Sequence, residues 1–266
     1  MSKSITFNSF SLQDTNFLTK DIIYRNLPSR SIDIEPYSRR DGFRLVDSYY
    51  NLKDISVAGM LSRDTEANLK TSLDDMKKAL NVEEANLDIG DGAGTMRYVC
   101  TVASIDIPEE HYHITNLPYK IVFRCEPFGQ ATSTTTITRT VTGSPASVFT
   151  TVGSAPQLPI FKWVCTGAPS APITQIVLRV YNTDGTPSDM SITVPSLALD
   201  ANGDYLEIDT NLMTVKVSHD GGAATEIDYS GVFPFVCSGA NSYDVVVSGG
   251  GTFNLTETIV YYAKYL

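Results

Sequence analysis

The histidines are the residues of this chain whose type and spacing could hold a metal. His111 and His113 alternate as they would on one face of a strand, with two glutamates just before them. No third strong ligand can be named, and the segment lies between two prolines, so a surface loop is the favoured interpretation. His219 stands beside an Asp-Gly-Gly turn, away from any nucleophile motif. We therefore predict neither a metal centre nor a catalytic triad.

Two glycine-containing segments could bind ions. Residues 88–94, Asp-Ile-Gly-Asp-Gly-Ala-Gly, are similar to a phosphate loop, but such a loop leads from a strand into a helix. Here the expected order is helix, loop, strand, so we predict a turn. Residues 200–204, Asp-Ala-Asn-Gly-Asp, resemble the start of a calcium loop but lack its closing glutamate, so a turn is predicted again. Paired carboxylates for glycoside hydrolysis remain open, because their spacing is three-dimensional. We expect no enzyme activity and no cofactor.

Trp163 is the single tryptophan, and it has two interpretations. An exposed tryptophan could stack against a sugar ring, which makes Trp163 a candidate glycan contact. Its segment, Ile-Phe-Lys-Trp-Val at 160–164, alternates as a strand does, which favours a place in a β-sheet core.

The four cysteines are far apart and form no Cys-X-X-Cys pair, so a zinc site is not supported. Each lies in or just after an apolar run typical of a strand. We predict that all four are reduced thiols in the core. They are Cys100, Cys125, Cys165 and Cys237.

Composition predicts a globular, soluble protein made in a cytosol. Of the 266 residues, 42% are hydrophobic and 19% are charged, no apolar run approaches the roughly 18 residues that span a bilayer, and no signal peptide is evident. The net charge of −10 repels phosphate backbones, so we expect neither nucleic-acid binding nor membrane insertion.

A Thr- and Ser-rich stretch, residues 130–145, marks a change in composition, and we place a domain boundary there. Domain 1–140 is predicted to be β-rich with one helix at 64–80. Asp64 is its expected cap and Asn81 its stop, and an apolar stripe runs along it. The stripe is Leu69, Leu73, Met76 and Leu80. Domain 141–266 has short strands separated by turns, which is typical of an antiparallel β-sandwich. The expected fold is mainly β, and the residues alone indicate a two-domain binding or assembly protein.

The order of several segments resembles the distal tail proteins of long-tailed, siphovirus-type bacteriophages. In the first half, Phe7–Phe10 is similar to the family's opening strand, and Arg40-Asp41-Gly42 to a loop before the domain's helix. In the second half the similar segments are Gly203–Thr210, Gly231–Pro234, Gly239–Asn241 and the ending Ile259–Leu266. The resemblance covers nearly the whole chain.

The resemblance implies a structural virion protein at the tail tip, synthesised in the host cytoplasm. The N-terminal domains would form a homohexameric ring that joins the tail tube protein to the tail hub protein. The C-terminal domain, galectin-like or carbohydrate-module-like, would project outward and hold receptor-binding proteins or touch host-surface saccharide. The alternative function is a carbohydrate-binding module that contacts host glycans through Trp163.

The loop over residues 36–50 is the candidate ring or tail interface, because it is rich in arginine and aromatic residues. A solvated hairpin tip is the alternative interpretation of this loop. Its candidate contact residues are Arg39, Arg40, Phe43, Arg44, Tyr49 and Tyr50.

Overall fold

The computed structural model describes residues 3–36, 43–92, 94–108, 115–143, 146–181 and 187–266. The chain divides into two compact units, residues 1–132 with Leu266 and residues 133–265. They are called unit 1 and unit 2 below. Within the described ranges, no helix is both long and apolar enough to cross a bilayer.

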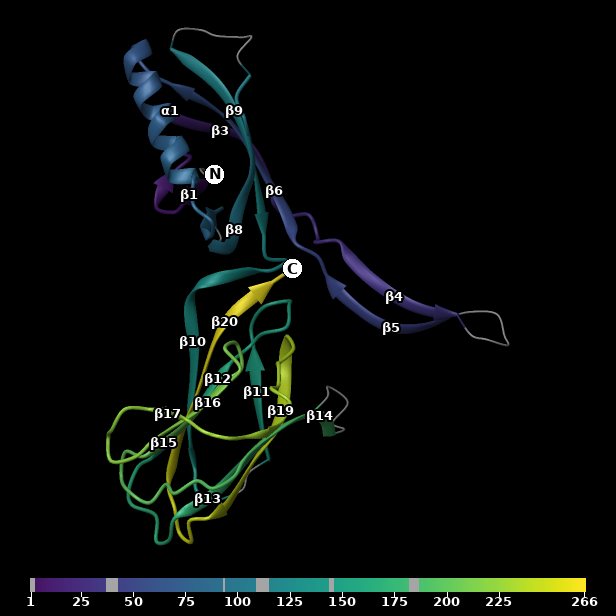
Figure 1. Ribbon diagram of the computed structural model, residues 1–266, viewed down its shortest axis with the longest axis vertical. Helices are drawn as coiled ribbons and strands as arrows, with labels where there is room; N and C mark the ends of the chain where they lie inside the picture. Colours follow the sequence, from purple (N-terminus) through teal and green to yellow (C-terminus); the bar gives the residue numbers. More distant parts are fainter. Residues whose placement is uncertain (1–2, 37–42, 93, 109–114, 144–145, 182–186) are drawn as a thin grey trace. The chain divides into compact units, whose positions relative to one another are not determined.

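Unit 1 is built on one antiparallel sheet (Figure 1). Its strands pair in the order β2-β1-β7-β8-β9-β6-β3. They are β1 (Ser4–Phe7), β2 (Phe10–Ser11), β3 (Phe17–Ile23), β6 (Lys53–Ser62), β7 (Ala85–Gly90), β8 (Thr95–Asp106) and β9 (Asn116–Cys125). Residues 88–90 of the predicted turn belong instead to β7, and the link that follows joins β7 to β8 rather than the helix to a strand.

Helix α1 (Glu66–Leu80) forms where the sequence predicts it, and the cap differs by one residue. Thr65, not Asp64, accepts a hydrogen bond from the Asn68 backbone N–H, while Asp64 accepts one from the Asn68 side chain. Asn81 ends the helix, as expected. The apolar stripe packs into the core, with Leu69, Met76 and Leu80 buried and Leu73 partly buried.

The two faces of the β3-β6-β9 sheet differ. Along β6, Ile55, Val57 and Leu61 are buried in the same cluster as α1, whereas the alternate residues stay partly open. We call that second side the outer face. It comprises Leu18, Ile23, Ser56, Met60, Pro118 and Val122, which the strand register places side by side. Leu18 and Ile23 remain 53% and 47% exposed there.

A two-stranded hairpin, β4 (Arg30–Pro36) with β5 (Phe43–Tyr50), follows β3 and leads into β6 (Figure 1). Among the described strands, the two pair only with each other. Hydrogen bonds between Asn51 and Ser29 close its base, and the Tyr50 ring packs against Phe128 with centroids 5.2 Å apart. The base of the hairpin is therefore held firmly in unit 1.

Unit 2 is an antiparallel β-sandwich, as predicted. One sheet has the order β17-β16-β15-β12-β20-β10 and the other β11-β19-β13-β14-β18, and the buried side chains form one cluster between them. The first sheet contains β10 (Gly129–Val141), β12 (Ile160–Cys165), β15 (Tyr205–Asp209), β16 (Thr214–Ser218), β17 (Thr225–Glu226) and β20 (Leu255–Tyr265). The second contains β11 (Ala146–Thr151), β13 (Ile173–Tyr181), β14 (Pro187–Val194), β18 (Ser230–Gly231) and β19 (Gly239–Gly249).

Strand β3 is the last strand on its side of the unit 1 sheet. Its pairing with β6 slips by one residue between Thr19 and Asp21, which makes Lys20 the extra residue of a β-bulge. The Lys20 side chain is exposed.

The cysteines depart from the prediction of four reduced core thiols. Cys100 and Cys125 form a disulfide, because strands β8 and β9 place them directly opposite each other with Cα atoms 4.0 Å apart. Cys165 is a buried free thiol, as predicted, and burial raises its pKa to about 11. Cys237 is free but exposed, so its predicted core position is wrong.

Candidate functional site

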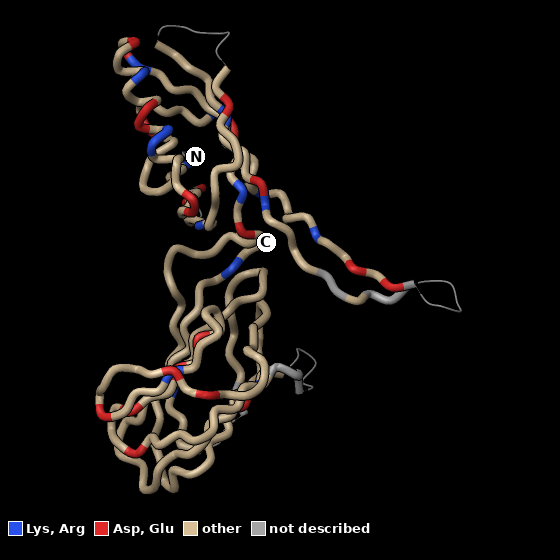
Figure 2. The backbone as a smooth tube through the Cα atoms, viewed as in Figure 1, with Lys and Arg blue, Asp and Glu red and all other residues tan. Residues whose placement is uncertain are grey.

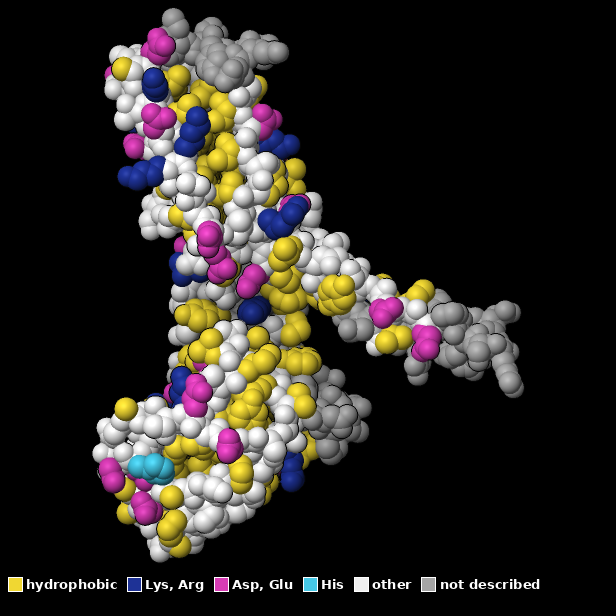
Figure 3. All heavy atoms as spheres, viewed as in Figure 1, with side chains coloured by type: hydrophobic (Ala, Val, Ile, Leu, Met, Phe, Trp, Pro, Cys, Tyr) yellow, Lys and Arg dark blue, Asp and Glu magenta, His cyan; other side chains and the backbone are white. Residues whose placement is uncertain are grey.

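The β4–β5 hairpin carries the predicted interface, and it is amphipathic. Along β4, Ile32 and Ile34 are 59% and 50% exposed and alternate with Asp33 and Glu35. Successive residues of a strand point to opposite faces, so the two isoleucines share one face and the two acids the other. Hydrophobic and acidic side chains are both visible along the hairpin in Figure 3. Two exposed isoleucines on one face make the hairpin a candidate contact surface.

The tyrosines predicted for this interface lie at the base of the hairpin. Tyr49 is 58% exposed, whereas Tyr50 is partly buried between Phe128 and the Arg30 guanidinium, 5.5 Å from the ring centroid. Tyr50 therefore holds the hairpin in place, and Tyr49 remains available for a partner. Ile32 and Ile34 are not among the predicted interface residues, although their alternation with acids in a short strand is visible in the sequence.

The structure describes only part of the arginine-containing segment of the predicted interface. Arg39 and Arg40 lie outside the described residues. Phe43 and Arg44 belong to β5, where the register pairs Phe43 with Pro36 and Arg44 with Glu35.

Trp163 lies in the core of unit 2 with no exposed surface. A fully buried ring cannot stack against a sugar, so the structure contradicts the glycan contact and confirms the core interpretation. Its indole Nε1 donates a hydrogen bond of 2.8 Å to Glu257, its cross-strand neighbour on β20.

Glu257 is a carboxylate with no exposed surface, and it joins the two sheets of the sandwich. Besides the Trp163 indole, it accepts a 2.6 Å hydrogen bond from the Tyr243 hydroxyl and an ion-paired hydrogen bond from Arg139 Nε. Burial, followed by the charge of Glu257, raises the pKa of Tyr243 far above its usual value. A fully buried carboxylate that already accepts hydrogen bonds from three side chains acts as a structural link in the core.

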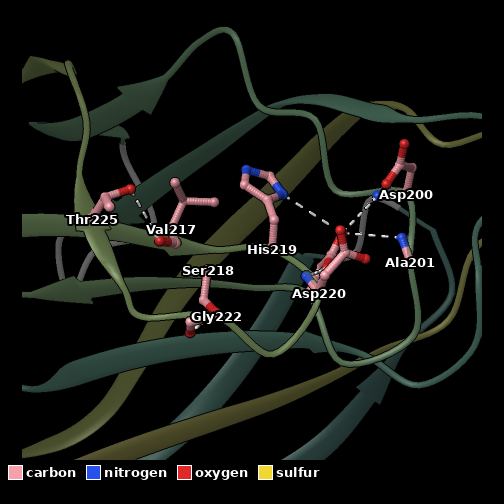
Figure 4. Close-up of polar contacts among 9 residues, drawn as sticks. Asp200, Ala201, Val217, Ser218, His219, Asp220, Gly222 and Thr225 are labelled. Atoms are coloured by element: carbon pink, nitrogen blue, oxygen red, sulfur yellow. Dashed lines mark hydrogen bonds and ion pairs between the residues drawn. The ribbon is translucent and has the colours of Figure 1, made fainter.

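Asp204, the last residue of the segment that resembles a calcium loop, is buried and ties two turns together. Figure 4 shows residues of these two turns, among them Asp200 and Ala201 from one and His219 and Asp220 from the other. Its carboxylate accepts backbone N–H groups from Asp200, Ala201 and Asp220 at 3.0, 3.0 and 2.8 Å, with His219 Nδ1 3.6 Å away. Burial alone would raise the pKa of Asp204, but these N–H donors and His219 lower it. Because N–H groups surround the carboxylate, it has no free direction for a cation, and the prediction of a turn here is confirmed.

The acids of the glycine-rich segment 88–94 are paired with arginines. Asp88, on β7, forms two 2.8 Å hydrogen bonds with Arg97, and Asp91 pairs with Arg25 at 2.7 Å. His111 and His113 lie outside the described residues. The described residues hold no group of three or more His, Cys, Asp or Glu side chains arranged as a metal site.

Charge is unevenly distributed along the chain. Figure 2 shows Lys and Arg mainly on unit 1, while few appear on unit 2. Unit 2 carries five Lys and Arg against eleven Asp and Glu, so it is acidic.

Comparison with known proteins gives a relationship in structure only. No protein-family model matches the chain, and no curated protein matches it by sequence. The crystal structure of the SPP1 Dit (gp 19.1) protein, described as a paradigm of hub adsorption apparatus in Gram-positive-infecting phages, has a TM-score of 0.71. It is 14% identical and covers 100% of both chains.

The phage P2 baseplate in its activated conformation is also similar. The structure with Ca has a TM-score of 0.49 at 9% identity over 98% of both chains, and the structure with Sr has 0.44 at 8% over 96% and 97%. The sequence identity to SPP1 Dit is low, but the structural match includes both units and the hairpin. The chain therefore has the fold of SPP1 Dit along its whole length, which confirms the fold expected from the resemblance in its sequence.

Proposed function

We propose that this protein is a structural component of the tail tip of a long-tailed phage and is not an enzyme. In this proposal unit 1 forms a homohexameric ring that joins the tail tube to the tail hub, and unit 2 carries components that adsorb to the host. The observation that carries the proposal is the fold match to SPP1 Dit over the full length of both chains. The buried, fully paired states of Glu257 and Asp204 agree with a structural role.

The hairpin is the proposed contact between neighbouring copies. Burying an isoleucine completely contributes roughly 1.5–3 kcal/mol, and about half of that remains to be gained at Ile32 and Ile34. Unit 1 has a second apolar surface, the outer face with Leu18 and Ile23. The base of the hairpin is fixed by Asn51 and leads away from the end of β6, so we infer that the outer face of a second copy receives it.

Contact between two different surfaces of identical chains is head-to-tail. Such an interface generates a closed ring when the rotation between neighbours closes, and an open filament when it does not. A ring is thus the simplest assembly that satisfies both surfaces at once. Tyr49 and the segment that contains Arg39, Arg40, Phe43 and Arg44 are proposed to extend the same contact.

Mass in solution tests this proposal. Light scattering of the full chain across a wide concentration range, with negative-stain microscopy of any large species, should reveal six-fold rings with a central channel. The double variant Ile32→Asp/Ile34→Asp should lower the mass to that of a monomer. The matched control is Leu212→Asp/Met213→Asp, which places two acids at positions of unit 2 that are 63% and 64% exposed, and it should leave the mass unchanged.

A wild-type chain that stays monomeric at every concentration would count against self-assembly through the hairpin. Equal masses for both double variants and an oligomeric wild type would place the contact elsewhere. For the alternative, a glycan-binding module, glycan arrays probed with the wild type give the measurement. Binding there would require a surface other than Trp163.

A further inference from the structure

The disulfide lies where the unit 1 ladder ends. Cys100 and Cys125 are the last pair of the β8–β9 ladder, and both side chains are buried. On its other edge β9 pairs with β6 over ten consecutive residues, from Lys53 opposite Cys125 to Ser62 opposite Asn116. The ladders of β9 with β6 and with β8 align Cys125 opposite Cys100, so the disulfide joins two residues that the strands already bring together.

The end of this ladder leads directly to the base of the hairpin. After Cys125, the Glu126 N–H donates to the Val99 carbonyl at 2.9 Å, and Phe128 then packs on Tyr50. A bond between Cys100 and Cys125 therefore fixes the strand end from which Phe128 reaches the hairpin. Without it, the pair at the ladder end is free to fray, as terminal pairs do.

The surroundings permit exchange chemistry at these sulfurs. A surface hollow of about 430 Å³ is lined by both cysteines together with Leu52, Arg124 and Glu126, which gives small molecules a route to otherwise buried sulfurs. The thiolate is the species that attacks a disulfide, so exchange proceeds where a small-molecule disulfide reaches a deprotonated cysteine.

We propose that Cys100 and Cys125 form a redox lock that closes after folding and stiffens the base of the β4–β5 hairpin. In a reducing cytosol the pair is a dithiol, and in an oxidising medium it closes by exchange with a small-molecule disulfide. One thiolate attacks the small disulfide, forming a mixed disulfide and releasing one small thiol. The second thiolate attacks the protein sulfur, forming the Cys100–Cys125 bond and releasing the other small thiol. The lock concerns the hairpin base within one chain, so it does not depend on ring assembly.

The first test is chemical trapping of the full chain. Cells producing the protein in a reducing cytosol are lysed directly into urea with N-ethylmaleimide, and peptides are analysed by mass spectrometry. Both Cys100 and Cys125 should be alkylated. After native purification and incubation with glutathione disulfide, both should be protected, while Cys237, exposed and free, remains reactive to alkylation or mixed-disulfide formation. A Cys100–Cys125 bond already formed in the cells would overturn closure after folding.

The second test is amide hydrogen exchange of the oxidised protein against the same protein reduced with a phosphine. Exchange at residues 126–130 and 49–52 should be roughly threefold or more slower when the bond is closed, with unit 2 unchanged. Cys100→Ser should match the reduced protein, and Cys237→Ser should match the wild type in both states. Equal exchange at the hairpin base in the two states would overturn the lock, and reduction of the wild type decides this even where Cys100→Ser fails to fold.

Discussion

Replacing Glu257 by glutamine removes one buried negative charge without changing the shape of the side chain. The Trp163 indole donates to one carboxylate oxygen, and the Tyr243 hydroxyl and Arg139 donate to the other, so the single amide oxygen of glutamine can serve only one side, and Arg139 also loses its counter-ion. The largest part of the expected loss of folding stability comes from the Arg139 guanidinium, which is left without a counter-ion at the edge of the sandwich core.

The size of the loss in unfolding free energy depends on how exposed the Arg139 side chain is. Breaking a buried ion pair by removing one member costs about 3–5 kcal/mol. The Arg139 side chain is 24% exposed, so water stabilises part of the orphaned charge and we expect the low end, about 3 kcal/mol. With an unfolding entropy of about 2.1 cal/mol/K per residue, a unit of this length loses roughly 10 °C in its unfolding midpoint.

The assay is tryptophan fluorescence during thermal unfolding. Trp163 is the only tryptophan and lies in unit 2, so its emission follows that unit alone. The matched control is Glu207→Gln, which breaks the partly exposed Lys162–Glu207 pair, 3.5 Å long, on the same sheet and should cost at most about 1 kcal/mol. If the unfolding midpoint of Glu257→Gln lies within about 3 °C of that of Glu207→Gln, the buried Glu257 carboxylate does not contribute the expected stability.

Three further predictions concern single features. The folded-state pKa of Asp204 lies below its unfolded value of about 3.9, so the stability it provides is complete above that pH and is lost as the pH falls through the folded-state pKa. Asp204→Asn should therefore flatten the acid unfolding curve followed by tryptophan fluorescence, and an unchanged slope would contradict the role of the carboxylate. Gly231→Ala should cost about 1–3 kcal/mol in urea unfolding, because φ is +112° and a Cβ would lie 2.0 Å from the Ser191 carbonyl oxygen. Gly143→Ala, with open space around it, is its neutral control. Reducing the Cys100–Cys125 bond, which spans 25 residues, should cost unit 1 about 3.5 kcal/mol by circular dichroism, and an equal shift in the tryptophan transition would argue against a local effect.

The elements with strong periodicity could be predicted from the sequence. The apolar stripe of α1 and the alternation of the unit 2 strands both describe how a segment contacts the core, and this is a local property of the chain. The helix cap was misplaced by one residue because Asp64 and Thr65 are both good caps, and only the backbone conformation decides between them.

Features that depend on register or on contacts distant in sequence could not be predicted in the same way. The disulfide required knowing that β8 and β9 pair with Cys100 opposite Cys125, which no local pattern gives. The burial of Glu257 did have a signal in the sequence, because Glu257 occupies an inward position between Leu255 and Ile259 in an alternating strand. A carboxylate in such a row indicates a buried, paired acid. Its partners Arg139 and Tyr243 come from other strands and could not be named beforehand.

The bulge in β3 bears on how the protein behaves at high concentration. Exposed strand edges recruit further strands into fibrils, and native proteins prevent this with bulges and lysines placed on the edge strand. β3 has both devices at one position, Lys20. Deleting Lys20 would straighten that edge and remove its charge together, so the expected phenotype is insoluble, thioflavin-positive aggregate rather than a failure of folding.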